Sequence, residues 1–142
     1  MARILGIDYG ERRIGLAISD PTGIIAQPLP TLTRRAGKRA PLGAIADLIR
    51  SYEVATVVIG LPLDLSGNET DWTREVRAFG AKLAERTGVA VEFVDERLTS
   101  VRAERAVREL GLRKSELHDK ARIDAAAAQL ILQGFLDRRR DA

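Results

Sequence analysis

ILGIDYGERRIGLAISD, residues 4–20, is the stretch that decides the fold of this chain. Two apolar runs, residues 4–9 and 14–19, flank a short charged turn, which predicts two strands joined in a hairpin. Asp8 lies inside the first run, where burying its carboxylate costs free energy unless a cation or several hydrogen-bond donors meet it. Glycines two residues before and two residues after this acid let a phosphate, a metal ion or another backbone come close. Asp8 is therefore a candidate functional residue, and an Asp that caps a hairpin turn is the alternative.

The composition is typical of one compact domain with a basic surface. The chain has 142 residues, of which 45% are hydrophobic, so we predict a single domain over residues 1–142. Its net charge is +3 at pH 7, and the basic residues are mostly arginines, which suit phosphate and carboxylate partners. The absence of cysteine excludes disulfides, thiolate metal sites and thiol nucleophiles. No leader-like segment and no apolar run near the roughly 20 residues of a membrane span is seen. We expect a soluble cytoplasmic protein with no membrane partner, either a monomer or a non-covalent homodimer.

The rest of the pattern predicts an α/β fold, with a mixed sheet and helices on both of its faces. A third strand at 24–33 contains two prolines and should lie at an edge. The continuous apolar run at 54–60 is typical of a strand covered on both faces inside a parallel sheet. The other predicted elements are a helix opening at Pro41, a helix from Thr70 or Asp71 to about Arg86, a strand at 89–94, a helix from Thr99 or Ser100 to about Leu110, a polar loop at 112–120 and a helix at 121–137. This order favours an antiparallel meander of strands one to three followed by parallel strands.

A second acid occupies the last predicted helix. The segment IDAAAAQLIL, residues 123–132, is apolar almost all round, which predicts a buried helix. Its alanine run would let the helix lie close against a sheet. Asp124 shares that face with Ile131 by helical spacing, and an ionised carboxylate there needs an arginine, a lysine or a metal ion. The alternative is that Asp124 lies in the first helical turn and stabilises the helix dipole.

A third acid follows the predicted strand at 89–94. Asp95 and Glu96 should point to opposite faces by the two-residue period of a strand, so one of them can reach the mouth of the sheet. The alternative is a pair of acids at a helix entry. Because chemistry in open α/β sheets lies beyond the carboxyl ends of the parallel strands, we predict that Asp8, Glu96 and Asp124 converge. Three carboxylates would repel one another without a cation, and hard divalent ions such as Mg²⁺ or Mn²⁺ suit oxygen ligands.

Four blocks of the sequence, taken in order, resemble one known family. They are GIDYG with RIG and SD in residues 6–20, GLPL with a later glycine from residue 60, DERLTS at 95–100, and IDAAA with LILQ in 123–133. Each block is weakly specific alone, since a GxDxG turn also opens sugar kinases and chaperone ATPases. Together they cover essentially the whole chain, which resembles the YqgF (RuvX-like) family of RNase H-like nucleases. Members of that family carry the names Holliday junction resolvase and pre-16S ribosomal RNA nuclease.

The resemblance implies a ribonuclease H-like fold with a five-stranded mixed sheet. It also implies a metal-dependent nuclease whose catalytic and metal-binding acids are Asp8, Glu96 and Asp124, with Mg²⁺ or Mn²⁺ as cofactor. The leading substrate is the RNA precursor of the small ribosomal subunit, matured at its 5′ end during ribosome biogenesis, with assembling ribosomes as a further partner. Branched DNA, cut by a Holliday junction resolvase, is the alternative substrate. An rRNA-binding assembly factor without catalysis is the alternative from another functional class.

Basic residues near these acids are predicted to contact the nucleic-acid backbone. Phosphate contacts are what positions a nucleic acid on such an enzyme. The predicted contacts are Arg12, Arg13, Arg34, Arg35, Lys38, Arg39, Arg97, Lys120 and Arg122. For each of them, a salt bridge or a solvated surface charge is the alternative. Trp72 and Phe79 are expected in the core, and His118, the one histidine, is interpreted as a bystander.

Overall fold

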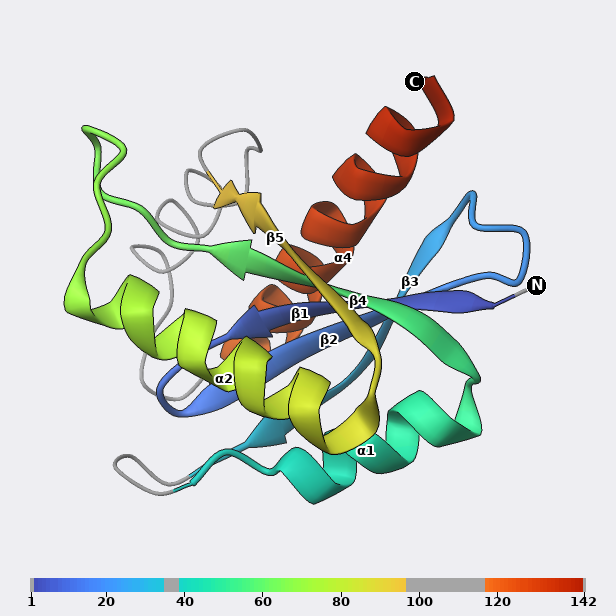
Figure 1. Ribbon diagram of the computed structural model, residues 1–142, viewed down its shortest axis with the longest axis horizontal. Helices are drawn as coiled ribbons and strands as arrows, with labels where there is room; N and C mark the ends of the chain where they lie inside the picture. Colours follow the sequence, from blue (N-terminus) through green and yellow to red (C-terminus); the bar gives the residue numbers. More distant parts are fainter. Residues whose placement is uncertain (1, 35–38, 97–116, 142) are drawn as a thin grey trace.

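The fold is built on a five-stranded mixed sheet. The computed structural model describes residues 2–34, 39–96 and 117–141. The strands are β1 (Arg3–Tyr9), β2 (Arg13–Ser19), β3 (Ala26–Thr33), β4 (Val54–Leu61) and β5 (Ala90–Asp95), in the spatial order β3-β2-β1-β4-β5. β1, β2 and β3 pair antiparallel, whereas β4 pairs parallel with both β1 and β5. The predicted α/β class, the meander, the proline-bearing edge strand and the parallel interior strand are confirmed (Figure 1).

Helices cover both faces of the sheet, as predicted. α1 (Leu42–Ser51) and α2 (Asp71–Thr87) lie on one face, and α4 (Leu117–Asp141) crosses the other (Figure 1). α2 begins at the predicted place, because Thr70 and Thr73 each accept a hydrogen bond from the other's backbone N–H in a capping box. It ends at Gly88, whose φ of +74° is a left-handed conformation that glycine adopts without strain. Over the three described ranges, no helix has the length and apolar character needed to cross a membrane.

The predicted boundaries of the last helix are wrong. The polar loop predicted to reach residue 120 is helical from Leu117, and the helix continues past 137 to Asp141. No glycine or proline occurs between residues 112 and 133, and polarity alone does not stop a helix. The helix predicted from Thr99 or Ser100 to about Leu110 lies outside the described residues.

The start of β3 also differs from the prediction. β3 begins at Ala26 rather than at residue 24. The reason is the preceding turn, in which the Asp20 carboxylate accepts hydrogen bonds from the backbone N–H groups of Ile24 (2.8 Å) and Ile25 (2.9 Å). These hydrogen bonds lower the pKa of Asp20, with the bond from Ile25 as the largest cause. Isoleucine is common in strands, but the N–H groups of these two isoleucines donate to the Asp20 carboxylate in the turn rather than to a neighbouring strand.

The sheet separates two hydrophobic clusters, and alternate residues of a strand pack into the cluster on one face or the other. Leu5 and Ile7 of β1 belong to the cluster that includes α1 and α2 side chains, whereas Ile4 belongs to the cluster that includes α4. β4 alternates in the same way, with Val57 on the first side and Val58 on the second. This two-residue period decides which face each functional side chain reaches.

α4 lies so close to the sheet that several strand positions have room only for glycine. A Cβ atom added to Gly6 would lie 2.7 Å from Cβ of Leu132, and one added to Gly15 would lie 2.0 Å from the carbonyl oxygen of Asp124. A Cβ on Gly60 would meet a side-chain atom of the same helix at 2.6 Å. The helix contributes buried alanines to this contact. The predicted close approach of the alanine run is therefore confirmed.

We expect Gly15→Ala to destabilise the fold, because its Cβ would collide with helix backbone rather than with a movable side chain. Overpacking of this kind costs about 1–3 kcal/mol of unfolding free energy, which urea denaturation followed by circular dichroism would measure. Gly43→Ala is the matched control, since its Cβ would meet only the end of the Arg86 side chain, at 3.5 Å. Alanine in that helix should be neutral or stabilising by up to about 1 kcal/mol. Equal stability of the two variants would contradict the close-packing argument.

Candidate active site

Asp8 is buried near the carboxyl end of β1, on the face of the sheet that α4 covers. Its neighbours Ile7 and Tyr9 belong to the cluster on the opposite face, so the period of the strand turns Asp8 toward α4. The residue is only 6% exposed. Directly across the β1–β2 ladder from it lies Gly15. Asp8 thus sits beside a strand position without a side chain, which leaves room for a group from α4.

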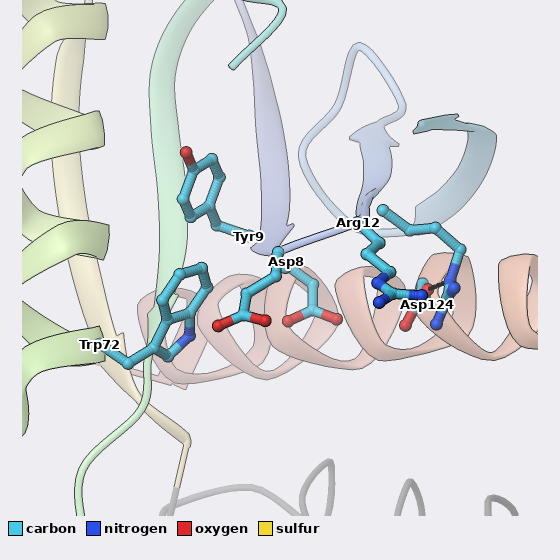
Figure 2. Close-up of a pocket in the computed structure, with 8 residues that line it drawn as sticks. Asp8, Tyr9, Arg12, Trp72 and Asp124 are labelled. Atoms are coloured by element: carbon cyan, nitrogen blue, oxygen red, sulfur yellow. Dashed lines mark hydrogen bonds and ion pairs between the residues drawn. The ribbon is translucent and has the colours of Figure 1, made fainter. Parts of the chain in front are cut away.

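Asp124 occupies that room. It lies well inside α4, which begins at Leu117, so the alternative that it stabilises a first helical turn is wrong. Its backbone lies against Gly15, the partner of Asp8 in the ladder. Asp8 and Asp124 line one cavity of about 360 Å³, together with residues 9–13 and Trp72. In Figure 2, Asp8 lies between Trp72 on one side and the labelled Arg12 and Asp124 on the other.

Arg13 holds the carboxylate of Asp124. From the start of β2, its Nε donates a hydrogen bond to Oδ2 of Asp124 at 2.6 Å, and the two side chains are 27% and 12% exposed. Hydrogen bonds between ionised groups are short and comparatively strong, so this contact fixes the position of the carboxylate. Among the described residues Arg13 is its only partner, and Oδ1 is available to a further ligand. The sequence predicts an arginine, a lysine or a metal ion beside Asp124. The structure has an arginine there, and the cavity lies beside this ion pair.

Glu96 is buried on the same face of the sheet but does not line this cavity. It follows β5 directly and is 3% exposed. A Cβ added to Gly60 would lie 2.8 Å from its Oε1, so the side chain reaches over β4, the strand beside β1. In the part of the chain that the structure describes, no group of three or more His, Cys, Asp or Glu residues is placed to hold a metal ion. The structure thus brings Asp8 and Asp124 together, and the convergence of all three acids stays a prediction.

The chemistry of the cavity fits a hard divalent cation. Its lining offers carboxylate oxygens from Asp8, Glu11 and Asp124, and among the residues that the structure describes no histidine lines it. Mg²⁺ is usually bound by one or two carboxylates together with water and substrate phosphates, rather than by a closed cage of side chains. The open Oδ1 of Asp124 matches that mode of binding.

The nine predicted nucleic-acid contacts fall in different places. Arg12 lines the cavity with Asp8, and Arg13 binds Asp124. Arg34 lies over the ring of Tyr9, 4.9 Å from its centroid, and Arg39 lines another cavity. Lys120, Arg122 and His118 belong to α4, but their side chains lie outside the described part of the chain, as do the whole of Arg35, Lys38 and Arg97.

A column of aromatic rings borders the cavity. The ring of Tyr9 stacks on Trp72 with centroids 5.7 Å apart, and on Phe79 at 4.1 Å. Phe79 is in the core, as predicted, whereas Trp72 packs partly buried against the core and also lines the cavity. Its place at the start of α2, after the loop that leaves the carboxyl end of β4, is the signal that could have identified it. Burial raises the pKa of the Tyr9 hydroxyl, and the charge and hydrogen bond of Arg34 lower it in part.

Comparison with known sequences finds close similarity to one family. The sequence model of the family described as "RuvX: Holliday junction resolvase" matches residues 2–138. A protein of Anaeromyxobacter sp. (strain Fw109-5) named "Putative pre-16S rRNA nuclease" is 47% identical over 137 residues, which are 96% of this chain and 98% of that protein. A protein of the same name from Koribacter versatilis (strain Ellin345) is 47% identical over 140 residues, covering 96% of this chain and 88% of its own.

Solved structures share the fold. RuvC of T. thermophilus, in complex with a Holliday junction substrate, matches with a TM-score of 0.58 at 18% identity, over 99% of this chain and 96% of that one. The Fowlpox virus resolvase, in complex with Holliday junction DNA, matches with a TM-score of 0.55 at 10% identity, over 96% and 98% of the two chains. At these identities the likeness concerns the fold, and the predicted ribonuclease H-like architecture is confirmed.

We expect Arg13→Met to destabilise the protein, because it leaves the Asp124 carboxylate without its partner at a site that is 12% exposed. Losing a hydrogen bond to a charged group costs about 1.5–3 kcal/mol of unfolding free energy, measurable by urea denaturation. Arg50→Met is the matched control, since the Arg50–Asp47 pair is exposed on both sides (78% and 68%). Such pairs contribute about 0–1 kcal/mol. Arg13→Met combined with Asp124→Asn should recover part of the loss, and strictly additive effects would contradict a direct coupling.

Proposed function

The chain belongs to the RuvX family, a family of nucleases, and we propose that it hydrolyses phosphodiester bonds in structured nucleic acid with a divalent metal ion. The observation that carries this proposal is the cavity shared by Asp8 and Asp124. These acids come from opposite ends of the chain, and both are mostly buried. Burying acids together costs free energy, and such arrangements are concentrated at functional sites.

Five charged residues have roles in the proposed mechanism. Asp8 and Asp124 would hold Mg²⁺ or Mn²⁺, and Glu96, on the same face of the sheet, is the third proposed ligand. A divalent ion bound there would neutralise phosphate oxygens and lower the pKa of an attacking water. Arg13 keeps the Asp124 carboxylate in place. Arg12, at the wall of the cavity, is positioned to pair with a phosphate oxygen of the substrate and orient the scissile bond.

We propose the 5′ end of the precursor of 16S ribosomal RNA as the substrate, in the cytoplasm and on assembling ribosomes. The names of two relatives, each 47% identical over almost the whole chain, support this assignment. Branched DNA is the second candidate, supported by the family's description and by the two resolvase structures of the same fold.

We expect Asp8→Asn to lower the rate of metal-dependent cleavage by on the order of 100-fold or more, the size typical of removing one charge-stabilising group from an active site. The substitution removes the charge while keeping the shape, so circular dichroism should show a folded protein. Asp47→Asn is the matched control, because Asp47 is an exposed acid on α1 whose partner is Arg50. It should cleave at the wild-type rate.

Metal dependence is measured in the same assay. Activity should disappear with a chelator and return with Mg²⁺ or Mn²⁺. Undiminished cleavage by a folded Asp8→Asn variant would remove Asp8 from the mechanism. A protein that binds rRNA tightly, cleaves nothing and does not bind these ions in calorimetry would instead be an assembly factor without catalysis.

The substrate assignment is tested by offering both nucleic acids to one preparation. We expect a transcript that carries the 5′ leader of 16S rRNA to be cut at a kcat/KM at least about tenfold higher than a four-way DNA junction. That ratio corresponds to about 1.4 kcal/mol of transition-state discrimination. The Asp8→Asn variant shows whether either product comes from a contaminating nuclease. A preference of the same size for the junction would overturn the RNA assignment and favour the resolvase activity.

A further inference from the structure

A larger cavity lies on the other side of Tyr9 from the active site. Its volume is about 640 Å³, and it is formed by the start of α1, the segment before it and one face of α2. Tyr9 lines both this cavity and the one that contains Asp8. The two cavities are therefore neighbours that meet at this residue, at the end of β1.

Positive charge is concentrated in this second cavity. Among the described residues, its charged lining consists of Arg34, Arg39, Lys82 and Arg86, with Glu75 as the one acid. This excess of three positive charges equals the net charge of the whole chain, so the formal charges of all other residues sum to zero. A cleft lined by charges of one sign focuses the electric field and attracts ions of the opposite sign.

The geometry of α2 explains how these charges come together. Glu75, Lys82 and Arg86 are spaced by seven and four residues, which places them on one face of the helix. Within the described ranges, neither Lys82 nor Arg86 takes part in an ion pair, and the same holds for Arg39. By contrast, Arg74 and Arg77 of the same helix are paired with Asp71 and Glu69. Within the described residues, Lys82, Arg86 and Arg39 are thus available to a ligand.

Arg34 connects this positive charge to the active-site side. Its backbone N–H donates a 2.7 Å hydrogen bond to the carbonyl oxygen of Arg12, which anchors it to the β1–β2 hairpin. Its Nη1 donates to the hydroxyl of Tyr9, and its guanidinium lies over the Tyr9 ring. Arg12 itself lines the active-site cavity. A chain of cations therefore runs from the proposed scissile bond, past Tyr9, to Lys82 and Arg86.

The lining of the cavity also includes apolar residues, among them Leu42, Ala78 and Phe79. Gly43 adds no side chain, and a Cβ there would lie 3.5 Å from Nη2 of Arg86. Cations and apolar surface in one cavity match a phosphate attached to a sugar or a base better than they match a free inorganic anion.

We propose that this cavity binds a backbone phosphate of the nucleic-acid substrate beyond the cleaved bond, with Lys82 and Arg86 as its main contacts. The identity of the ligand as substrate rests on the nuclease function proposed above. The substrate backbone then passes from the cavity of Asp8, around the end of the β1–β2 hairpin and over Tyr9, into the second cavity.

The test measures RNA binding by the full chain in the presence of a chelator, so that no cleavage occurs. The probe is a fluorescein-labelled hairpin RNA from the 5′ leader of 16S rRNA, followed by anisotropy at several salt concentrations. The variant is Lys82→Met combined with Arg86→Met. Arg138→Met combined with Arg139→Met is the matched control, since it removes two exposed charges from the far end of α4 (Figure 1). Thermal unfolding verifies that both variants fold.

We expect the Lys82/Arg86 variant to bind more weakly and to lower the slope of log K against log[salt] by about 1 for each lost phosphate contact. The Arg138/Arg139 control should keep the wild-type slope. In cleavage assays with Mg²⁺, the Lys82/Arg86 variant should raise KM and keep kcat within about twofold, because an interaction equal in the ground and transition states changes binding alone. Equal slopes for the two double variants would overturn the proposal.

Two further outcomes separate the possibilities. Calorimetry with adenosine monophosphate and with inorganic phosphate tests the other source of a phosphate group. Binding of either one that depends on Lys82 and Arg86, with unchanged RNA affinity, would overturn the backbone assignment in favour of a small-ligand site. If the salt slope changes as expected but the wild type cleaves nothing with Mg²⁺ or Mn²⁺, the phosphate site stands and the nuclease function fails.

Discussion

The contact between α4 and the glycines of the sheet is the constraint on which the site depends. Gly15 pairs with Asp8 across the β1–β2 ladder, and the backbone of Asp124 occupies the space that a side chain at Gly15 would fill. Any side chain at that glycine would push the helix outward and separate the two acids. Gly6 repeats the same close contact further along the helix, at Leu132. The position of Asp124, a proposed metal ligand, is therefore fixed by core packing, and the buried apolar side chains of α4 supply the free energy that holds this acid near Asp8.

The β1–β2 hairpin supplies the charges that make this arrangement tolerable. The N–H of Gly10 donates to the carbonyl oxygen of Arg13 at 3.1 Å, and a Cβ on Gly10 would lie 2.5 Å from that same oxygen. The turn is tight because glycine permits it. Two consecutive arginines are thereby held near Asp8, one of them bound to Asp124 and the other at the wall of the cavity. Arg13, which is close to Asp8 in the sequence, thus neutralises Asp124, which comes from the far end of the chain.

Local patterns predicted the sheet well, and tertiary partners account for what they missed. The period of two and the glycine–proline punctuation located every strand of the described chain, because these signals lie within a few residues of one another. Asp8 and Asp124 could be singled out because each is an acid in an apolar run. Three features could not be predicted: the pairing of Asp124 with Arg13, the place of Trp72 at the cavity, and the cations on one face of α2. Each depends on which helix face packs against which loop, and this cannot be derived from a single sequence. The prediction of where β3 begins was wrong for a similar reason, because the Asp20 carboxylate accepts hydrogen bonds from N–H groups that a strand would otherwise use.

The alternation of β1 also explains why the two cavities lie side by side. Asp8 and Tyr9 are consecutive, so the strand sends the acid to the α4 face and the phenol ring to the α2 face. A polymer that reaches both cavities has to pass the end of the hairpin, where residues 10–13 form the turn and line the active-site cavity. A short turn keeps that path short, and the stacked rings of Trp72 and Tyr9 lie beside it. The proposed chemistry on one face and the proposed phosphate site on the other thus meet at a single strand end. For a substrate that reaches both, we expect a flexible single-stranded segment to follow this path more readily than a stiff duplex.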